Sequence, residues 1–267
     1  MALVRRALPL TATLLLAAAL FAGCGGSGRR ESGTTTAAPA PAPVDVAQAG
    51  ARTTGAGTAR FTLTIAGSVG DLGMRADERG TVAFVRPRAH IYKLLATGGI
   101  PEELIVDGPF EYANGDIQAA MNDPSVKPWT KLDTRRLSAR QRSSNGDELS
   151  HVRAPAYLID GVAHATRIGT TPGGLVHVRG MVDPALLAAR VPAPVRAGVV
   201  AAVASDFTDR PFPADFWLDA KGRVRRVHVS YANGANGRIT LDATYSGFGS
   251  PVPLGLPPAS HVQDISP

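Results

Sequence analysis

The chain has 267 residues, a formal net charge of +6 and a hydrophobic fraction of 44%. Four of its 28 basic residues are lysines, and the arginines are scattered along the chain rather than gathered in one segment. A nucleic-acid-binding protein concentrates positive charge on one face or stripe, so this pattern argues against a nucleic-acid partner. Residues 44–267 have a length that suits one domain.

The first 23 residues have the pattern of an export signal. Arg5 and Arg6 precede an uncharged apolar run over residues 7–21, and two small residues follow it. This run is shorter than the roughly 20 apolar residues that a transmembrane helix needs. It therefore predicts a secretory signal peptide over residues 1–23.

Cys24 is the single cysteine of the chain and directly follows this segment. The sequence Phe21-Ala22-Gly23-Cys24 resembles a bacterial lipobox, with Phe21 at the position where leucine is usual. In that motif the cysteine becomes the first mature residue and carries diacylglycerol. The alternative, an unmodified exposed thiol, is a liability in an oxidising compartment. We therefore expect lipidation at Cys24, which would hold the protein at the outer leaflet of the cell membrane.

Residues 24–43 consist mainly of Gly, Ser, Thr, Ala and Pro. Such a composition has almost no apolar bulk to bury and predicts a disordered tether. A flexible chain of this length reaches about 25 Å on average. The domain predicted over residues 44–267 would therefore lie close to the membrane without a fixed orientation.

Strand patterns dominate the first half of this domain, after a weak helix candidate at residues 44–54. Phe61, Leu63 and Ile65 alternate with threonines, which is the period of a half-buried strand. The extended segments predicted next are residues 80–87, 89–96, 102–108, 110–115 and 127–133.

The middle of the chain contains the helix signals. Residues 132–162 are polar and partly helical, with Pro155 and Asp160-Gly161 as expected helix breakers. A hairpin is predicted around residues 170–174. Asp183-Pro184 is a good helix start, with the aspartate as cap and the proline in the first turn.

A second helical run is predicted at residues 193–207, and three strands are predicted within residues 213–249. Their turns are expected at residues 219–222 and 233–237. Strands, then a few helices, then strands again, without regular alternation, predict an α+β fold. The expected architecture is a large antiparallel sheet with helices on one face.

Motifs of catalysis and metal binding are missing from the sequence. It contains no G-x-S-x-G, H-E-x-x-H, P-loop or G-x-G-x-x-G pattern. The six histidines are not spaced as metal ligands. Asp215 and Asp219 are candidates for a catalytic pair of carboxylates. Spacing alone does not distinguish such a pair from two solvent-facing strand residues. We therefore expect no enzyme, no metal and no cofactor.

Two further features allow more than one interpretation. Trp129 and Trp217 are candidates for stacking on a sugar or for lining an acyl-chain pocket. Packing in the core is the simpler interpretation for each. The segment "RVRRVHV" at residues 223–229 places Arg223 and Arg225 on one strand face and Arg226 and His228 on the other. It suits anionic lipid headgroups, although a solvated strand beside a charged turn explains it more simply.

The lipobox, the Pro/Ala-rich tether and the strand "TARFTLTIAGSV" at residues 58–69 together resemble actinobacterial lipoproteins of the LppX/LprG/LprA type. These proteins share a fold with the carriers LolA and LolB and with the sensor RseB. Further similar segments are residues 127–133, 182–192 and 213–229. The resemblance implies a strongly curved antiparallel β half-barrel with a few helices packed across its concave face. It also implies an apolar cavity between the two layers that holds lipid or glycolipid acyl chains.

Apolar residues that alternate on the predicted strands are the candidate lining of such a cavity. Each buried methylene of an acyl chain contributes about 0.8 kcal/mol, so a long chain needs no polar partner to bind. For each candidate, ordinary core packing is an equally good interpretation. The candidates are Phe61, Leu63, Ile65, Phe84, Ile91, Phe216, Leu218, Ile239 and Leu241.

The leading functional hypothesis is a membrane-anchored lipoprotein of the cell envelope that binds a lipid or glycolipid for carriage or presentation. Its expected partners are that ligand and the membrane reached through Cys24, with a membrane transporter as a further candidate. Two alternatives remain: a ligand-sensing regulator like RseB, and a structural lipoprotein that binds nothing. An additional domain, as in RseB, is not expected.

Overall fold

The computed structural model describes residues 43–69, 72–95, 101–114, 126–138, 148–207, 210–232 and 237–267. All of them belong to one compact unit, Ala40–Pro267. The predicted signal peptide, Cys24 and residues 24–42 of the predicted tether lie outside the described residues. Within the described part, none of the helices has the length and apolar character needed to cross a membrane.

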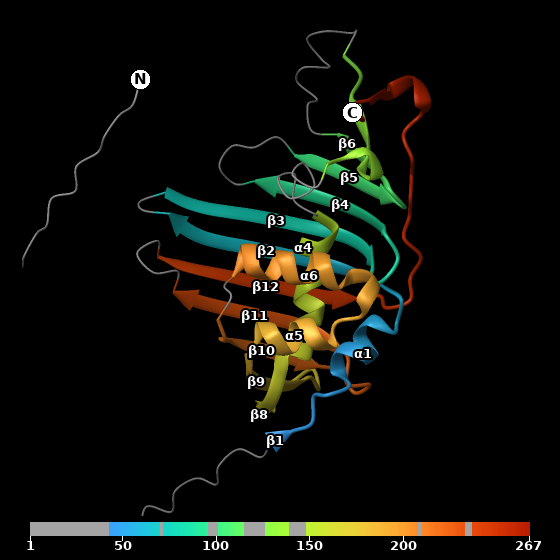
Figure 1. Cartoon of the computed structure of the whole chain (residues 1–267). Coiled ribbons are helices and arrows are strands. Elements are labelled where there is room, and N and C mark those ends of the chain that lie inside the picture. The colour runs from blue at the N-terminus through green and yellow to red at the C-terminus, as the bar shows by residue number, and fades with distance from the viewer. Residues whose placement is uncertain are drawn as a thin grey trace, which may run out of the picture. The chain divides into compact units, whose positions relative to one another are not determined.

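The described residues contain one sheet of thirteen strands (Figure 1). In spatial order the first six strands are β1 (Pro43–Val44), β8 (Val162–Thr170), β9 (Val176–Val182), β10 (Phe212–Leu218), β11 (Val224–Ala232) and β12 (Arg238–Ser246). The other seven are β2 (Thr58–Val69), β3 (Leu72–Ala83), β4 (Arg88–Leu95), β5 (Glu102–Asp107), β6 (Phe110–Asn114), β7 (Trp129–Asp133) and β13 (Val262–Asp264). Neighbouring strands are antiparallel except β13, which pairs with β7 in parallel.

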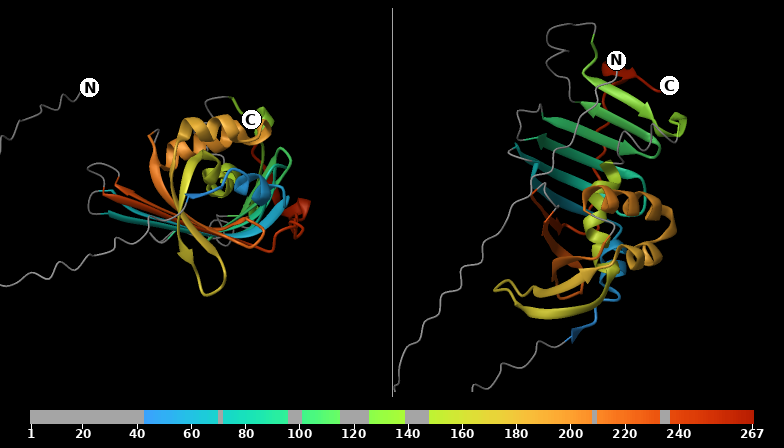
Figure 2. Two further views of the ribbon diagram at one scale, coloured as in Figure 1. Left: turned by 90° about the horizontal axis from the view of Figure 1, so that it is seen from below. Right: turned by 60° about the vertical axis from the view of Figure 1, so that its left-hand side comes forward.

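The sheet curves into a half-barrel, and the helices lie across its concave face (Figure 2). The fold is therefore the α+β class that the sequence pattern predicts and the half-barrel that the resemblance implies, with one difference. The parallel strand β13 makes the sheet mixed rather than purely antiparallel. It follows the proline-rich segment 251–258, which has no regular structure and carries the chain from the end of β12 to the free edge of β7.

Helix α4 (Glu148–Tyr157) lies in the hollow of the half-barrel, and α6 (Ala193–Asp206) covers it (Figure 2). Every side chain from Leu149 to Ile159 except His151 is buried. The other helices of the described residues are α1 (Ala49–Thr54), α5 (Pro184–Arg190) and short 3-10 helices at Thr134–Arg136, Leu158–Gly161 and Ala259–His261.

Two sequence-based expectations about helix ends have different outcomes. The start of α5 is confirmed, because the Asp183 carboxylate accepts hydrogen bonds from the Ala185 and Leu186 amides and Pro184 lies in the first turn. The prediction that Pro155 breaks the helix is wrong, since Pro155 lies inside α4. Burial of the surrounding turn on all sides outweighs the cost of about 3 kcal/mol that proline adds to a helix interior.

Hydrogen bonds fix α4 to the strands around it. The Tyr157 hydroxyl donates to the Phe84 carbonyl at 3.0 Å, and the Tyr245 hydroxyl of β12 donates to the Val152 carbonyl at 3.2 Å. The Arg153 guanidinium donates to the Ala83 carbonyl at 2.8 Å and also to the Arg86 carbonyl. Buried polar groups need such partners, so these bonds define one position for α4.

The Asp160 carboxyl lies in the turn after α4 and packs directly against Gly50 of α1. A Cβ atom at Gly50 would stand 1.9 Å from Asp160 Oδ1, so the two elements approach as closely as glycine allows. Burial raises the pKa of Asp160 to about 6, although the nearby charge of Arg190 lowers it in part. Between pH 4 and 6 the folded protein therefore holds a proton that the unfolded chain has released, and the free energy of unfolding falls as the pH rises.

Asp160→Asn is expected to raise the free energy of unfolding by about 2 kcal/mol at pH 7.5, because the variant has no buried charge to form. At pH 4 the carboxyl of the wild-type protein is protonated in the folded state, so the two proteins should be equally stable. Urea unfolding of both proteins across this pH range measures the difference, in which contributions from all other carboxylates cancel. A stability difference that does not depend on pH would contradict the assignment.

Candidate functional site

The nine apolar residues predicted to line a cavity all lie on the helix side of the sheet. Seven are buried in the core: Phe61, Leu63, Phe84, Ile91, Phe216, Leu218 and Leu241. Ile65 and Ile239 are half-buried. The structure thus brings the set together in and beside one continuous core, an arrangement compatible with core packing and with contact to an acyl chain.

An apolar strip continues from this core along the ends of β2, β11 and β12. Tyr231 pairs with Ile239 across the two strands, and both are half-buried. Ile239 also packs on Gly67, where a Cβ would stand 3.3 Å from its Cγ1. The Tyr231 hydroxyl donates to the Phe207 carbonyl at 2.7 Å, which ties the end of α6 to the sheet. We call Ile65, Tyr231 and Ile239 the apolar strip.

The opposite, convex face of the sheet, here called the outer face, carries an ordered array of polar and aromatic side chains. The rings of His177 and Trp217 stack at 4.4 Å, and the Arg226 guanidinium lies 4.7 Å from the Trp217 ring. Arg226 in turn pairs with Asp242, which also contacts His228. The interpretation of Trp217 as a core residue is therefore wrong, because the strand register places it on the outer face. Trp129 of β7 is half-buried.

Asp215 and Asp219 belong to separate ion pairs. Asp215 binds Arg179 at 2.9 Å and His177 at 2.7 Å. Burial raises the pKa of Asp215, but these hydrogen bonds outweigh burial and hold the pKa below its ordinary value. Asp219 accepts from Arg223 at 2.7 Å, in the turn between β10 and β11. Each carboxylate thus has a structural partner of its own.

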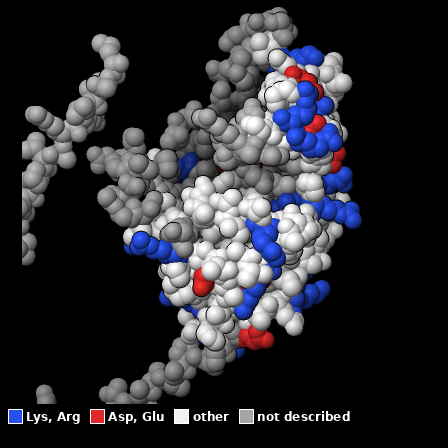
Figure 3. All heavy atoms as spheres, in the orientation of Figure 1, with Lys and Arg blue, Asp and Glu red and all other residues white. Residues whose placement is uncertain are grey.

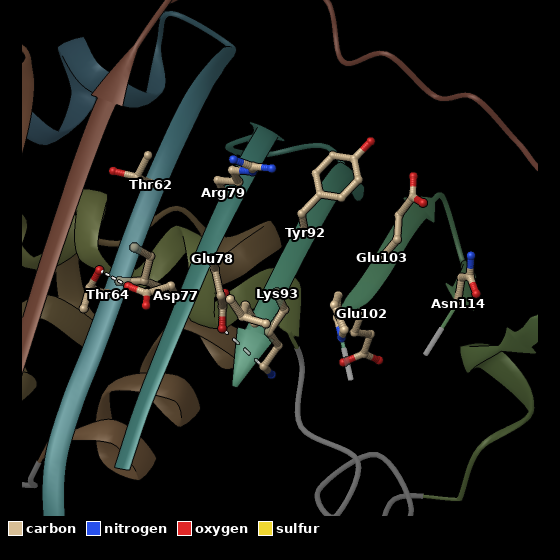
Figure 4. Close-up of a pocket in the computed structure, with 13 residues that line it drawn as sticks. Thr62, Thr64, Asp77, Glu78, Arg79, Tyr92, Lys93, Glu102, Glu103 and Asn114 are labelled. Atoms are coloured by element: carbon tan, nitrogen blue, oxygen red, sulfur yellow. Dashed lines mark hydrogen bonds and ion pairs between the residues drawn. The ribbon is translucent and has the colours of Figure 1, made fainter. Parts of the chain in front are cut away.

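A pocket of about 590 Å³ is present in the region of β2 to β6 (Figure 4). The described residues that line it are Thr62, Leu63, Thr64, Asp77, Glu78, Arg79, Tyr92, Lys93, Leu94, Pro101, Glu102, Glu103 and Asn114. By strand register, Thr62 and Thr64, Asp77 and Arg79, Tyr92 and Leu94, and Glu103 and Asn114 share the outer face. Most of the lining thus belongs to that face, and Leu63 is the one member of the predicted set that borders the pocket.

The polar side chains of the pocket are held in place by neighbours. The Asp77 carboxylate accepts from Thr64 at 2.6 Å and from Arg75 at 2.7 Å, and these bonds lower its pKa. His90 Nε2 lies 2.6 Å from Glu103, while His90 Nδ1 lies 2.9 Å from the Pro253 carbonyl. The segment after β12 is thereby attached to the outer face of β4.

Lys93 and Glu78 are charged residues on the helix side of the sheet that sequence reasoning missed. Lys93 Nζ lies 2.9 Å from Glu148 Oε1, at the start of α4, and 3.8 Å from Glu78 Oε1. Burial lowers the pKa of Lys93, but the hydrogen bond and charge of Glu148 outweigh burial and raise it. The available signal was a lysine at an inward position of a strand, two residues after the apolar Ile91.

Charges elsewhere are dispersed. On the face shown in Figure 3, lysines and arginines are spread over the surface and are mixed with acidic residues at the β6 end. Within the described ranges, no group of three or more His, Cys, Asp or Glu side chains is arranged to hold a metal ion.

No protein-family model and no curated protein matches this chain. Among solved structures it is similar to a LolA superfamily protein from Nitrosomonas europaea, with 10% identity, a TM-score of 0.28, and coverage of 78% of this chain and 93% of that one. It is also similar to a domain from Vibrio parahaemolyticus named for outer membrane lipoprotein sorting, with 9% identity, a TM-score of 0.25, and coverage of 79% and 92%. TM-scores this low do not establish a shared fold. The fold assignment therefore depends on the strand order and register of this chain.

Proposed function

We propose that the protein is a cell-envelope lipoprotein, anchored through Cys24, that binds the acyl chains of a lipid or glycolipid against the concave face of its sheet. The observation that carries the proposal is the apolar strip. A folded core normally ends where side chains become polar, whereas here half-buried Ile65, Tyr231 and Ile239 continue the apolar face beside the end of α6. Such a surface supports contact with an apolar guest.

The helix layer supports the same proposal. The buried face of α6 consists of small residues, Val195, Val199, Ala202 and Val203, and α6 packs mainly on α4 and α5. A displacement of α6 from the strand ends would break the hydrogen bond from the Tyr231 hydroxyl to the Phe207 carbonyl. Each methylene placed on the uncovered strip would contribute about 0.8 kcal/mol. Helix α4 would stay in place, because Tyr157, Tyr245 and Arg153 fix it.

The anchor and the binding surface occupy separate parts of the proposed molecule. Strand β1 pairs with β8 at Pro43 and Val44, so the predicted tether joins the domain at that edge of the sheet (Figure 1). The apolar strip lies on β2, β11 and β12, in the middle of the strand order. A lipid bound there would therefore be distinct from the lipid attached to Cys24.

Cys24→Ser separates the two lipids experimentally. The variant is expected to move from the membrane fraction to the soluble fraction of the envelope, because it cannot receive diacylglycerol. Native mass spectrometry of this soluble protein, purified from its own cells, should still find a bound lipid of defined mass. A Cys24→Ser protein that carries no lipid would favour a structural lipoprotein, and one that stays in the membrane fraction would refute the anchor.

Ile239→Asp, introduced into the Cys24→Ser protein, tests the apolar strip. A charge there should weaken binding of a fluorescent fatty acid by at least about tenfold, since the carboxylate must be desolvated under the acyl chain. The matched control is Thr240→Asp, because Thr240 is the next residue of β12 and faces the outer side. Equal affinities of the two variants, with both proteins folded by circular dichroism, would place the ligand elsewhere.

A further inference from the structure

Arg79 is a charged residue of the outer-face pocket that lacks a polar partner. Within the described residues its guanidinium forms no hydrogen bond or ion pair, and its close neighbour is the Tyr92 ring, whose centroid lies 6.0 Å from Cζ (Figure 4). It is exposed and projects from β3 opposite Thr62 of β2. A guanidinium can donate five hydrogen bonds in a planar fork, so Arg79 has capacity for an external acceptor.

Each carboxylate on the outer face of the pocket contacts a polar side chain other than Arg79. Asp77 is paired with Arg75, and Glu103 is held by His90. Glu78 and Glu102 lie on the helix side of the sheet, where Lys93 interacts with both. Among the described residues, the outer-face acids thus contact other side chains and the remaining two lie on the opposite side of the sheet, so the Arg79 guanidinium is available to a ligand.

The same pocket offers apolar surface beside this charge. Tyr92 and Leu94 lie two residues apart on β4, and these residues are 43% and 49% exposed. Thr62 and Thr64 of β2 line the pocket on the other side of Arg79 and Asp77. Isolated exposed apolar residues are ordinary, but an exposed ring and an exposed leucine in one pocket with a free guanidinium form a combined site.

We propose that this pocket binds a small ligand in which one anionic group, a carboxylate or a phosphate, is attached to an apolar or ring-shaped body. Arg79 binds the anionic group through its planar fork. Tyr92 and Leu94 contact the apolar body. This site is independent of the apolar strip, because its anchoring side chains face the opposite side of the sheet.

The test uses phenyl phosphate as the probe and the Cys24→Ser chain, labelled at its leucine methyl groups, as the protein. We expect phenyl phosphate to shift the Leu94 methyl resonances saturably in NMR spectra. Arg79→Ala should weaken this binding by at least about tenfold, as loss of a hydrogen bond to a charged group predicts. Benzylamine, which has a similar ring and the opposite charge, should not bind.

The matched control is Arg60→Ala, because Arg60 is an exposed arginine of the outer face, on β2, that does not line the pocket. It should change the affinity less than about twofold. Vesicles of phosphatidylglycerol identify the source of the anion: vesicle binding that depends on Arg79 would indicate a lipid headgroup, and probe binding alone would indicate a free anion. Equal effects of Arg79→Ala and Arg60→Ala, or no shift at Leu94, would overturn the proposal.

Discussion

Replacement of Arg153 by methionine is expected to lower the free energy of unfolding by about 3 kcal/mol. Arg153 is 4% exposed and lies on α4, inside the half-barrel. Its guanidinium donates to the carbonyls of Ala83 and Arg86, at the point where β3 turns into β4. Methionine fills a similar volume but has no donor, so the Ala83 carbonyl would remain buried without a partner. Urea denaturation of the purified domain measures the loss.

Arg196→Met is the matched control for this prediction. Arg196 also donates to a main-chain carbonyl, that of Val191 at 3.0 Å, but it lies exposed on α6 where water can replace it. Its loss should cost less than about 1 kcal/mol. If the two variants lost equal stability, the bonds between α4 and the β3–β4 connection would not be what positions α4.

The strands of this fold could be predicted because their sequence pattern is local. Phe61, Leu63 and Ile65 alternate with polar residues, and all three lie on the helix side of β2. The turn between β10 and β11 could also be predicted from its residues. The Asp219 carboxylate accepts hydrogen bonds from the Lys221 and Arg223 amides, and Gly222 has a φ of 71°. Hydrophobic alternation and turn-forming residues act over a few neighbouring positions, so they can be recognised in a single sequence.

The sequence predicts a helical segment within residues 132–162, but the continuation of α4 through Pro155, its burial and the presence of strand β13 could not be predicted, because they depend on distant partners. The sequence of α4 contains Arg153 and Pro155 and has no apolar stripe, since the helix is enclosed on nearly every side. Its polar groups bond to carbonyls about 70 residues away in the chain. Strand β13 has three residues and gains its hydrogen bonds from β7, far from it in sequence. Local secondary-structure propensity does not predict pairings between residues that are far apart in the chain.

The outer-face pocket illustrates the same limit for sites. Arg79, Tyr92 and Glu103 each occupy a polar position of an alternating strand, which by itself predicts a solvated residue. Only the register of β3, β4 and β5 places them side by side. Among the residues that the structure describes, Arg79 lacks a polar partner while its neighbours are paired, which is a property of the assembled sheet.

Gly80→Ala is expected to destabilise the protein by about 3 kcal/mol, because the backbone of β4 lies where the new methyl group would be. A Cβ at Gly80 would stand 1.9 Å from the His90 carbonyl oxygen and 3.1 Å from Ile91 Cα. Glycine within a strand often marks such a close approach of two backbones. The strands β3 and β4 would have to separate, which disturbs the pairing of Gly80 with Ile91 and the packing of Phe61 beside it.

Gly73→Ala in the same strand provides the control, since no atom among the described residues lies within 4 Å of the position that its new methyl group would take. It should change the free energy of unfolding by less than about 0.5 kcal/mol, because an exposed alanine adds no contact there. The pair thus isolates the close approach of β3 and β4 from the general effect of replacing a strand glycine. Equal stability of the two variants would mean that β4 can move away from β3 without cost, and that the close approach at Gly80 does not require glycine.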